Sequence, residues 1–98
     1  MARSGFDKRF PKRDEKAALL LASNMRRLRK AKGWSQGELA TAAGIEQQTI
    51  SLIETARANP TLLMLDTIAG VFGVQMIALF DPKALAGEAS RSSRRNTL

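Results

Sequence analysis

The side chains that could carry chemistry in this 98-residue sequence are carboxylates, amides, hydroxyls and basic groups, because it contains neither cysteine nor histidine. Disulfides, Cys/His zinc sites, a Ser-His-Asp triad and a cysteine nucleophile are therefore excluded. The sequence has no pair of carboxylates placed for acid–base catalysis and no Gly-rich phosphate loop. We therefore expect a binding protein rather than an enzyme, with no cofactor and no metal.

The charge of the chain indicates what kind of partner it binds. There are 16 Lys+Arg against 9 Asp+Glu, which gives a net charge of +7 and favours a polyanion such as nucleic acid. The basic excess lies in residues 1–32 and 83–98, whereas residues 33–82 contain one arginine and five acidic residues. Charge by itself therefore does not locate the binding surface.

No segment has the pattern of a targeting signal or a membrane span. The apolar run Ala17–Ala22 is shorter than the about 7–15 residues of a signal-peptide core and the about 20 residues of a spanning helix. The lack of cysteine fits a reducing compartment. We expect a cytoplasmic protein that has no membrane partner.

Hydrophobic periodicity and capping residues predict a series of helices. From Asp14, apolar residues recur every three or four positions until Gly33, which ends the first helix. Ser35 and Glu38 have the spacing of a capping box, and they begin a second, short helix that ends at Gly44. Short helices separated by glycines must therefore position the amide and hydroxyl side chains of this region.

The second helix and the one that follows it are joined by a glycine-containing turn, which is typical of a helix-turn-helix. The third helix is expected over residues 47–54, and Ala40 is small enough to let the two helices cross closely. Its inner face is apolar, so its outer face is free to enter a major groove of DNA. That outer face carries Gln47, Gln48, Ser51 and Thr55.

The last third of the chain predicts a fourth helix and one ambiguous segment. Thr61 caps the helix and Gly73 stops it, with inward residues expected at Leu62, Leu65, Ile68, Ala69 and Phe72. Residues 74–80 fit either a short helix that closes the core or a β-strand. The β-branched, apolar composition and the lack of a capping residue favour the strand, which would pair across a dimer.

A distinct family pattern emerges from the spaced residues of this region. Over about residues 21–80 the sequence resembles the Cro/repressor-type helix-turn-helix family, also called the XRE family. The matching positions are Asn24-Met25-Arg26-Arg27-Leu28-Arg29, Gly33-Trp34-Ser35-Gln36, Glu38-Leu39-Ala40, Gly44-Ile45, Thr49-Ile50-Ser51, Ile53-Glu54, Pro60, and Leu65 to Val74. The resemblance implies an all-α, compact four- to five-helix, lambda-repressor-like domain. It leaves open whether a strand at 74–80 is added to these helices.

The resemblance also implies a function and a division of the chain. We expect a homodimeric transcriptional repressor that binds a pseudo-palindromic operator in double-stranded DNA and is found on the nucleoid when bound. Residues 14–82 would form the DNA-binding and dimerisation domain. Residues 1–13 would be a flexible basic arm and residues 83–98 a disordered basic tail.

Individual roles are carried over from the family position by position. The expected base-reading residues are Gln47, Gln48, Ser51 and Leu52, the last through a thymine methyl group, and paired Gln side chains suit adenine. The expected phosphate-binding residues are Ser35, Gln36, Thr55, Arg57 and Arg26. Arg29 and Glu54 match a family pair that forms an internal salt bridge. Ala56 departs from the family, which prefers glycine after the third helix.

Apolar residues outside the predicted core stripe indicate a buried interface. We expect it to be a homodimer interface formed by Leu63, Met64, Val71, Met76, Ile77, Leu79 and Phe80. A C-terminal strand that pairs across the dimer also resembles the HipB-like antitoxin branch of the family. The alternative function is therefore an antitoxin that binds and neutralises a toxin protein and represses its own operon.

Overall fold

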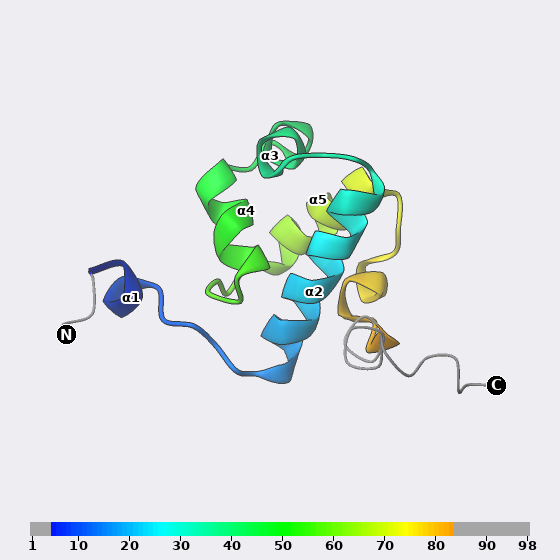
Figure 1. Cartoon of the computed structure of the whole chain (residues 1–98). Helices are drawn as coiled ribbons and strands as arrows, with labels where there is room; N and C mark the ends of the chain where they lie inside the picture. Colours follow the sequence, from blue (N-terminus) through cyan, green and yellow to red (C-terminus); the bar gives the residue numbers. More distant parts are fainter. Residues whose placement is uncertain (1–4, 84–98) are drawn as a thin grey trace.

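The computed structural model describes residues 5–83, and within this range the chain is all-helical (Figure 1). Its elements are α1 (Gly5–Arg9), α2 (Lys16–Ala31), α3 (Gln36–Ala43), α4 (Gln47–Glu54), α5 (Leu62–Phe72) and a 3-10 helix, η1 (Met76–Phe80). The predicted all-α fold class is confirmed. Of the predicted terminal segments, residues 1–4 and 84–98 lie outside the described residues.

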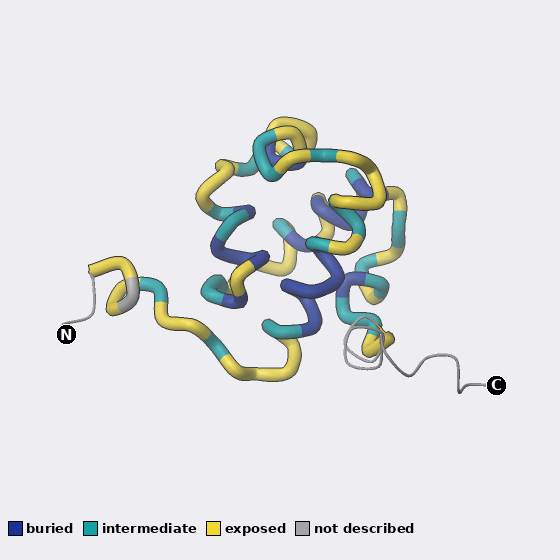
Figure 2. Tube along the Cα trace, viewed as in Figure 1, coloured by how far each residue is buried: buried dark blue, intermediate teal, exposed yellow. Residues whose placement is uncertain are grey.

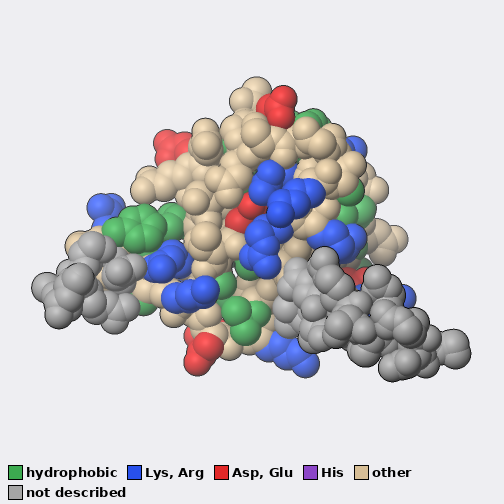
Figure 3. All heavy atoms as spheres, viewed as in Figure 1, with side chains coloured by type: hydrophobic (Ala, Val, Ile, Leu, Met, Phe, Trp, Pro, Cys, Tyr) green, Lys and Arg blue, Asp and Glu red, His purple; other side chains and the backbone are tan. Residues whose placement is uncertain are grey.

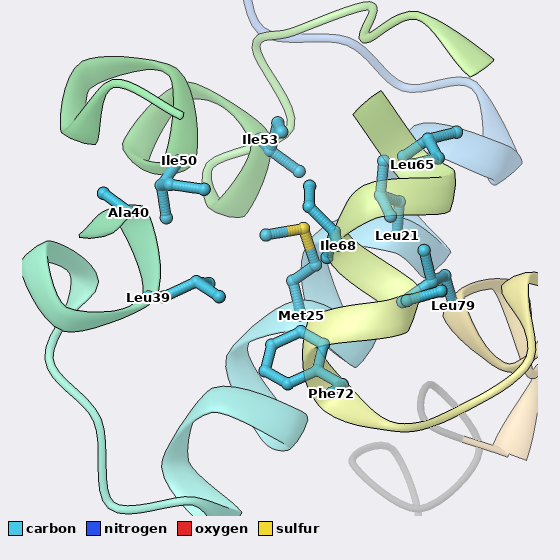
Figure 4. Close-up of a cluster of buried hydrophobic side chains, with 11 residues drawn as sticks. Leu21, Met25, Leu39, Ala40, Ile50, Ile53, Leu65, Ile68, Phe72 and Leu79 are labelled. Atoms are coloured by element: carbon cyan, nitrogen blue, oxygen red, sulfur yellow. The ribbon is translucent and has the colours of Figure 1, made fainter. Parts of the chain in front are cut away.

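The hydrophobic core lies where α2, α3, α4, α5 and η1 meet (Figure 2). Met25 of α2, Leu39 of α3, Ile50 of α4 and Ile68 of α5 are each completely buried, and their side chains converge in Figure 4. Leu79 of η1 is buried in the same cluster. Because each of these five helices supplies at least one side chain to the cluster, the position of α4 relative to α3 is fixed by packing.

The helix ends follow the predicted capping chemistry. The Ser35 hydroxyl accepts the N–H of Glu38 at 3.0 Å, and the Glu38 carboxylate accepts the Ser35 N–H at 2.7 Å, so the capping box at the start of α3 is confirmed. Gly44 ends α3 with φ of 67°, and Gly73 ends α5 with φ of 74°. Both glycines adopt the left-handed conformation that a Cβ disfavours.

The preferred strand at residues 74–80 is wrong, since residues 76–80 form η1. A buried asparagine of α2 explains the difference. The Asn24 amide nitrogen donates to the carbonyl oxygens of Leu79 at 3.0 Å and Asp81 at 3.1 Å. These bonds and the burial of Leu79 bind the segment to α2 within the same chain, which removes the need for a partner strand.

Leu62 also differs from its expected place in the core. It is 68% exposed, and the buried stripe of α5 begins only at Leu65. Thr61 accepts the Met64 N–H at 3.1 Å, so this cap places Leu62 at the first position of α5, before the buried stripe begins.

The N-terminal arm begins with helix α1 and then runs to α2 as an extended segment (Figure 1). The rings of Phe6 and Phe10 lie 5.3 Å apart, and the Arg57 guanidinium donates to the Phe10 carbonyl at 2.8 Å. Further along, the Arg13 N–H donates to the Ala56 carbonyl at 2.7 Å. The arm is therefore held at the turn that follows α4.

Two glycines that have space for a methyl group provide a test of this fold. Gly44→Ala should lower the free energy of unfolding by about 1–2 kcal/mol, because only its left-handed backbone opposes a Cβ. Gly70→Ala in helix α5 should raise it by about 0.5–1 kcal/mol through helix propensity. Urea denaturation of both variants measures the two opposite changes, and a loss at Gly70 would contradict the packing described.

Candidate nucleic-acid interface

Helices α3 and α4 form the helix-turn-helix that the sequence predicts. Ala40 is buried in α3, and its carbonyl accepts the N–H of Ile45 at 3.0 Å across the turn. The turn itself passes through Gly44. Small side chains and this backbone bond let α3 pack on α4 while α4 keeps one side away from the core.

The outer side of α4 carries a polar stripe. Gln47, Gln48 and Thr55 are exposed and Ser51 is half-buried, so the structure places these four predicted residues along one helix face. The Thr55 hydroxyl donates to the Ser51 carbonyl at 2.9 Å, which leaves its oxygen as an acceptor towards solvent. This stripe offers amide and hydroxyl groups to a ligand and has no charged side chain.

Gly37 of α3 makes room for the first residue of this stripe. A Cβ at Gly37 would come within 3.2 Å of the Gln47 side-chain oxygen. The Gln47 side chain therefore lies back against the first turn of α3 in the space that this glycine leaves. Nothing in the sequence pattern marks Gly37 for this role, because a glycine at the second position of a short helix has no distinctive spacing.

The structure does not place Leu52 on the polar stripe. Its side chain is only 9% exposed, so it cannot present its methyl groups to a thymine. The prediction that Leu52 reads a base is therefore wrong for this conformation. With about 3.6 residues per turn, Leu52 lies between Gln48 and Ala56 on the helix surface, and the last of these is buried too.

Arg29 and Glu54 form a buried ion pair beneath the helix-turn-helix. Arg29 Nε lies 2.7 Å from Glu54 Oε2, and Arg29 Nη2 donates to Glu54 Oε1 at 3.0 Å, which makes the pair bidentate. The Glu54 side chain is 2% exposed. The hydrogen bond to Glu54 raises the pKa of the Arg29 guanidinium above its ordinary value, and burial opposes this rise.

Two further contacts extend the ion pair to α3. Gln36 Nε2 donates to Glu54 Oε1 at 3.0 Å, and Arg29 Nη1 donates to the Trp34 carbonyl at 2.8 Å. Gln36 is the first residue of α3, where the helix dipole favours an anion. One buried carboxylate thus joins the end of α4, the start of α3 and the last turn of α2.

The other predicted phosphate-binding residues have distinct surroundings. The Ser35 hydroxyl is used by the capping box, while Thr55 is exposed on the polar stripe. Arg26 Nη1 donates to the Glu54 carbonyl at 2.7 Å, which closes the end of α4, and Arg57 binds the Phe10 carbonyl of the arm. Both arginines thus hold backbone carbonyls, which their spacing in the sequence did not indicate.

Lys and Arg side chains gather beside this region of the surface. Figure 3 shows them over α2 and again beside α1, on the face turned to the viewer. The acidic residues of the helix-turn-helix itself include Glu38, which is engaged in the capping box, and Glu46, which is exposed at the start of α4. The basic side chains of this face thus come from α2 and the arm, while the polar stripe of α4 is itself uncharged.

The residues predicted for a dimer interface fall into three groups. Leu63 and Ile77 are 78% and 74% exposed. Leu79 is fully buried in the core, so its placement in an interface is wrong. The remaining predicted residues are half-buried: Met64, Val71, Met76 and Phe80. Leu62, which the sequence interpretation assigned to the core, is exposed as well.

Among the described residues, no helix is long and apolar enough to cross a membrane. The described part of the chain also has no group of three or more residues that could hold a metal ion.

Comparisons with known proteins agree on the nature of this region. The helix-turn-helix family HTH_3 matches residues 25–79. An HTH-type transcriptional regulator of Sinorhizobium fredii, y4dJ, is 40% identical over 63 residues, which are 64% of this chain and 82% of that protein. The HTH-type transcriptional regulator SinR of Bacillus subtilis is 32% identical over 65 residues, or 65% of this chain and 59% of that protein.

A solved structure of another protein has a similar fold. The crystal structure of the hypothetical transcription factor NHTF from Neisseria superposes with a TM-score of 0.68 at 30% identity. The match covers 82% of this chain and 98% of that one.

Loss of one partner from the buried ion pair should unfold this region. Glu54→Ala leaves Arg29 without its carboxylate, and we expect it to lower the free energy of unfolding by about 3–5 kcal/mol. The matched control is Glu46→Ala, which removes an exposed carboxylate without a side-chain cap bond at the start of the same helix and should cost less than about 1 kcal/mol. Equal denaturation midpoints for the two variants would contradict a structural role for the pair.

Proposed function

Because this chain belongs to the helix-turn-helix family HTH_3, we propose that it is a DNA-binding transcriptional regulator that inserts α4 into the major groove. The observation that carries the proposal is the exposed stripe of Gln47, Gln48 and Ser51 on a helix whose inner face is locked in the core. Side-chain amides can both donate to and accept from base edges, and a Gln pairs in this way with adenine.

The surroundings of α4 support this placement. Thr55 lies at the end of the stripe, and Gln36 at the start of α3 is bonded to Glu54 at that same end of α4, so both offer polar groups where a sugar–phosphate backbone bordering the groove would pass. The stripe itself contains no Lys or Arg, and the basic side chains visible in Figure 3 lie over α2 and near α1. In this arrangement the basic groups supply attraction to any DNA, and the amides supply discrimination among sequences.

We propose further that the protein acts as a homodimer on a pseudo-palindromic operator and represses transcription. The support for a dimer is the exposure of Leu62, Leu63 and Ile77, three large apolar side chains that a second copy would remove from water. Two copies related by a two-fold axis would read two half-sites about one helical turn apart. Repression then follows from occupancy of the operator.

The antitoxin alternative has less support than before. It relied in part on a C-terminal strand that pairs across a dimer, and residues 76–80 form a 3-10 helix instead. The exposed apolar residues at positions 62, 63 and 77 are what remains in its favour, because a toxin could cover them as well as a second copy. Co-expression with the neighbouring gene product, followed by purification of a stable complex, would support this second function.

The polar stripe can be tested once an operator has been selected from random duplex DNA. The double variant Gln47→Ala/Gln48→Ala should lose about tenfold or more of the preference for that operator per lost base contact. Salt-dependent binding to random DNA should remain, because the basic groups are unchanged. Gln75→Ala, an exposed glutamine outside the helix-turn-helix, is the control and should keep the preference. Unchanged preference in the double variant would refute the assignment.

The dimer can be tested through its exposed apolar residues. Leu63→Glu and Ile77→Glu should each shift the protein from dimer to monomer in sedimentation equilibrium, because burying a carboxylate in an apolar interface is unfavourable. Ala31→Glu adds the same charge at an exposed position of α2 and should leave the dimer intact. The monomeric variants should also bind the full operator more weakly than the parent, with unchanged affinity for a single half-site. Dimers that persist in both variants would place the interface elsewhere.

A further inference from the structure

Two apolar residues at the C-terminal end of α4 are buried without being part of the main core. Leu52 and Ala56 are 9% and 3% exposed, yet neither belongs to the main buried cluster. Leu52 lies on the side of α4 turned away from Ile50 and Ile53, beside the polar stripe. Another part of the chain must therefore come close to the outer side of this helix end.

The N-terminal arm is attached at this place. The Arg13 N–H donates to the Ala56 carbonyl at 2.7 Å, and the Arg57 guanidinium donates to the Phe10 carbonyl at 2.8 Å. Arg57 also lies 5.3 Å from the centre of the Phe6 ring. These contacts hold both ends of the segment between α1 and Arg13 against the turn that follows α4.

The turn after α4 closes that helix and also offers a carbonyl to the arm. The Ala56 N–H donates to the Ile53 carbonyl at 3.1 Å and the Arg57 N–H donates to the Leu52 carbonyl at 2.8 Å. Ala56 has φ of 58°, and it is the one non-glycine residue in the described range with a left-handed backbone. This conformation is unfavourable for a residue with a Cβ. At Ala56 it accompanies a carbonyl that is paired with Arg13 and a side chain that is buried. The arm thus bonds to a turn whose conformation is fixed by the end of α4.

The docked arm presents basic side chains beside the polar stripe. Lys8, Arg9 and Lys12 are exposed, and α1 lies beside the turn that follows α4 in Figure 1. A major groove about 12 Å wide admits one helix, whose diameter with side chains is about 10–12 Å. A groove that α4 occupies has no room for α1, so the contacts open to α1 on that DNA are those with the sugar–phosphate backbone.

We propose that residues 5–13 are a second DNA-binding element, which is docked beside α4 and binds the phosphates that flank its groove through Lys8, Arg9 and Lys12. This inference rests on the proposed function, since it assumes that α4 enters DNA. It also gives Arg57 a different role from the expected one. Arg57 anchors the arm, and the phosphate contacts at this end of the helix come from the arm itself.

The first test measures how binding depends on salt. Full-length protein is titrated into a labelled random-sequence duplex several helical turns long, at KCl concentrations between about 50 and 200 mM. Lys8→Gln, Arg9→Gln and Lys12→Gln should each reduce the slope of log Kd against log[KCl] by up to about 0.9, because each lost phosphate contact releases one fewer counterion. Lys83→Gln removes one exposed charge where the described chain ends, across the domain from α1, and should leave the slope unchanged.

The second test separates the docking of the arm from its charge. Arg13→Gln and Arg13→Pro both remove the arginine charge, but only Arg13→Pro also removes the N–H that bonds to Ala56. Arg13→Pro should therefore bind the duplex at least several-fold more weakly than Arg13→Gln. Circular dichroism and thermal unfolding of both variants confirm that the helical domain is folded before binding is compared.

The outcomes distinguish this inference from the proposed function. Arm variants whose slopes equal that of Lys83→Gln would overturn the inference, and so would equal affinities of the two Arg13 variants. Tighter DNA binding by the arm variants would also overturn it, because the arm would then obstruct α4. A parent protein that selects no operator from random DNA would instead refute the sequence-specific function, whatever the arm does.

Discussion

The buried pair of Arg29 and Glu54 is the interaction on which the rest of this fold depends. Transfer of two charges out of water is costly, and a pair survives in the interior only when its remaining hydrogen-bonding groups are satisfied. Here Gln36 and the Trp34 carbonyl supply those bonds. The hydrogen bonds that one carboxylate requires therefore bring α2, α3 and α4 together. The direction in which the outer face of α4 points is set by these contacts.

Much of the fold could be predicted from the sequence because it depends on local chemistry. The capping box at Ser35 and the left-handed glycines at positions 44 and 73 act within a few residues, and they place the ends of α3 and α5. The inner stripe of α4 follows from helical periodicity alone. The polar outer face of α4 was predictable from the same periodicity, because it consists of the residues that remain once the inner face has been assigned.

The features that escaped prediction depend on contacts between distant segments. Residues 76–80 have a composition that suits a strand, but the choice of a 3-10 helix is made by Asn24, more than fifty residues earlier in the chain. Leu52 has the position of a base reader, and its burial depends on residues outside the main core cluster. The arginines at 26 and 57 look like phosphate ligands by charge, whereas each is bonded to a backbone carbonyl. A single sequence carries no signal for such pairings.

The shortness of α4 has a consequence for how much information the protein can obtain from DNA. Eight residues extend about 12 Å, and successive base pairs are about 3.4 Å apart, so one copy of the helix passes only three or four base pairs. A sequence of three or four base pairs recurs by chance about every 60 to 260 base pairs, whereas a genome offers about 10⁶ or more competing sites. A single copy of this domain can therefore recognise many sites in a genome but cannot select one of them. Selection of one site requires several copies, or several further contacts, to bind the same stretch of DNA together.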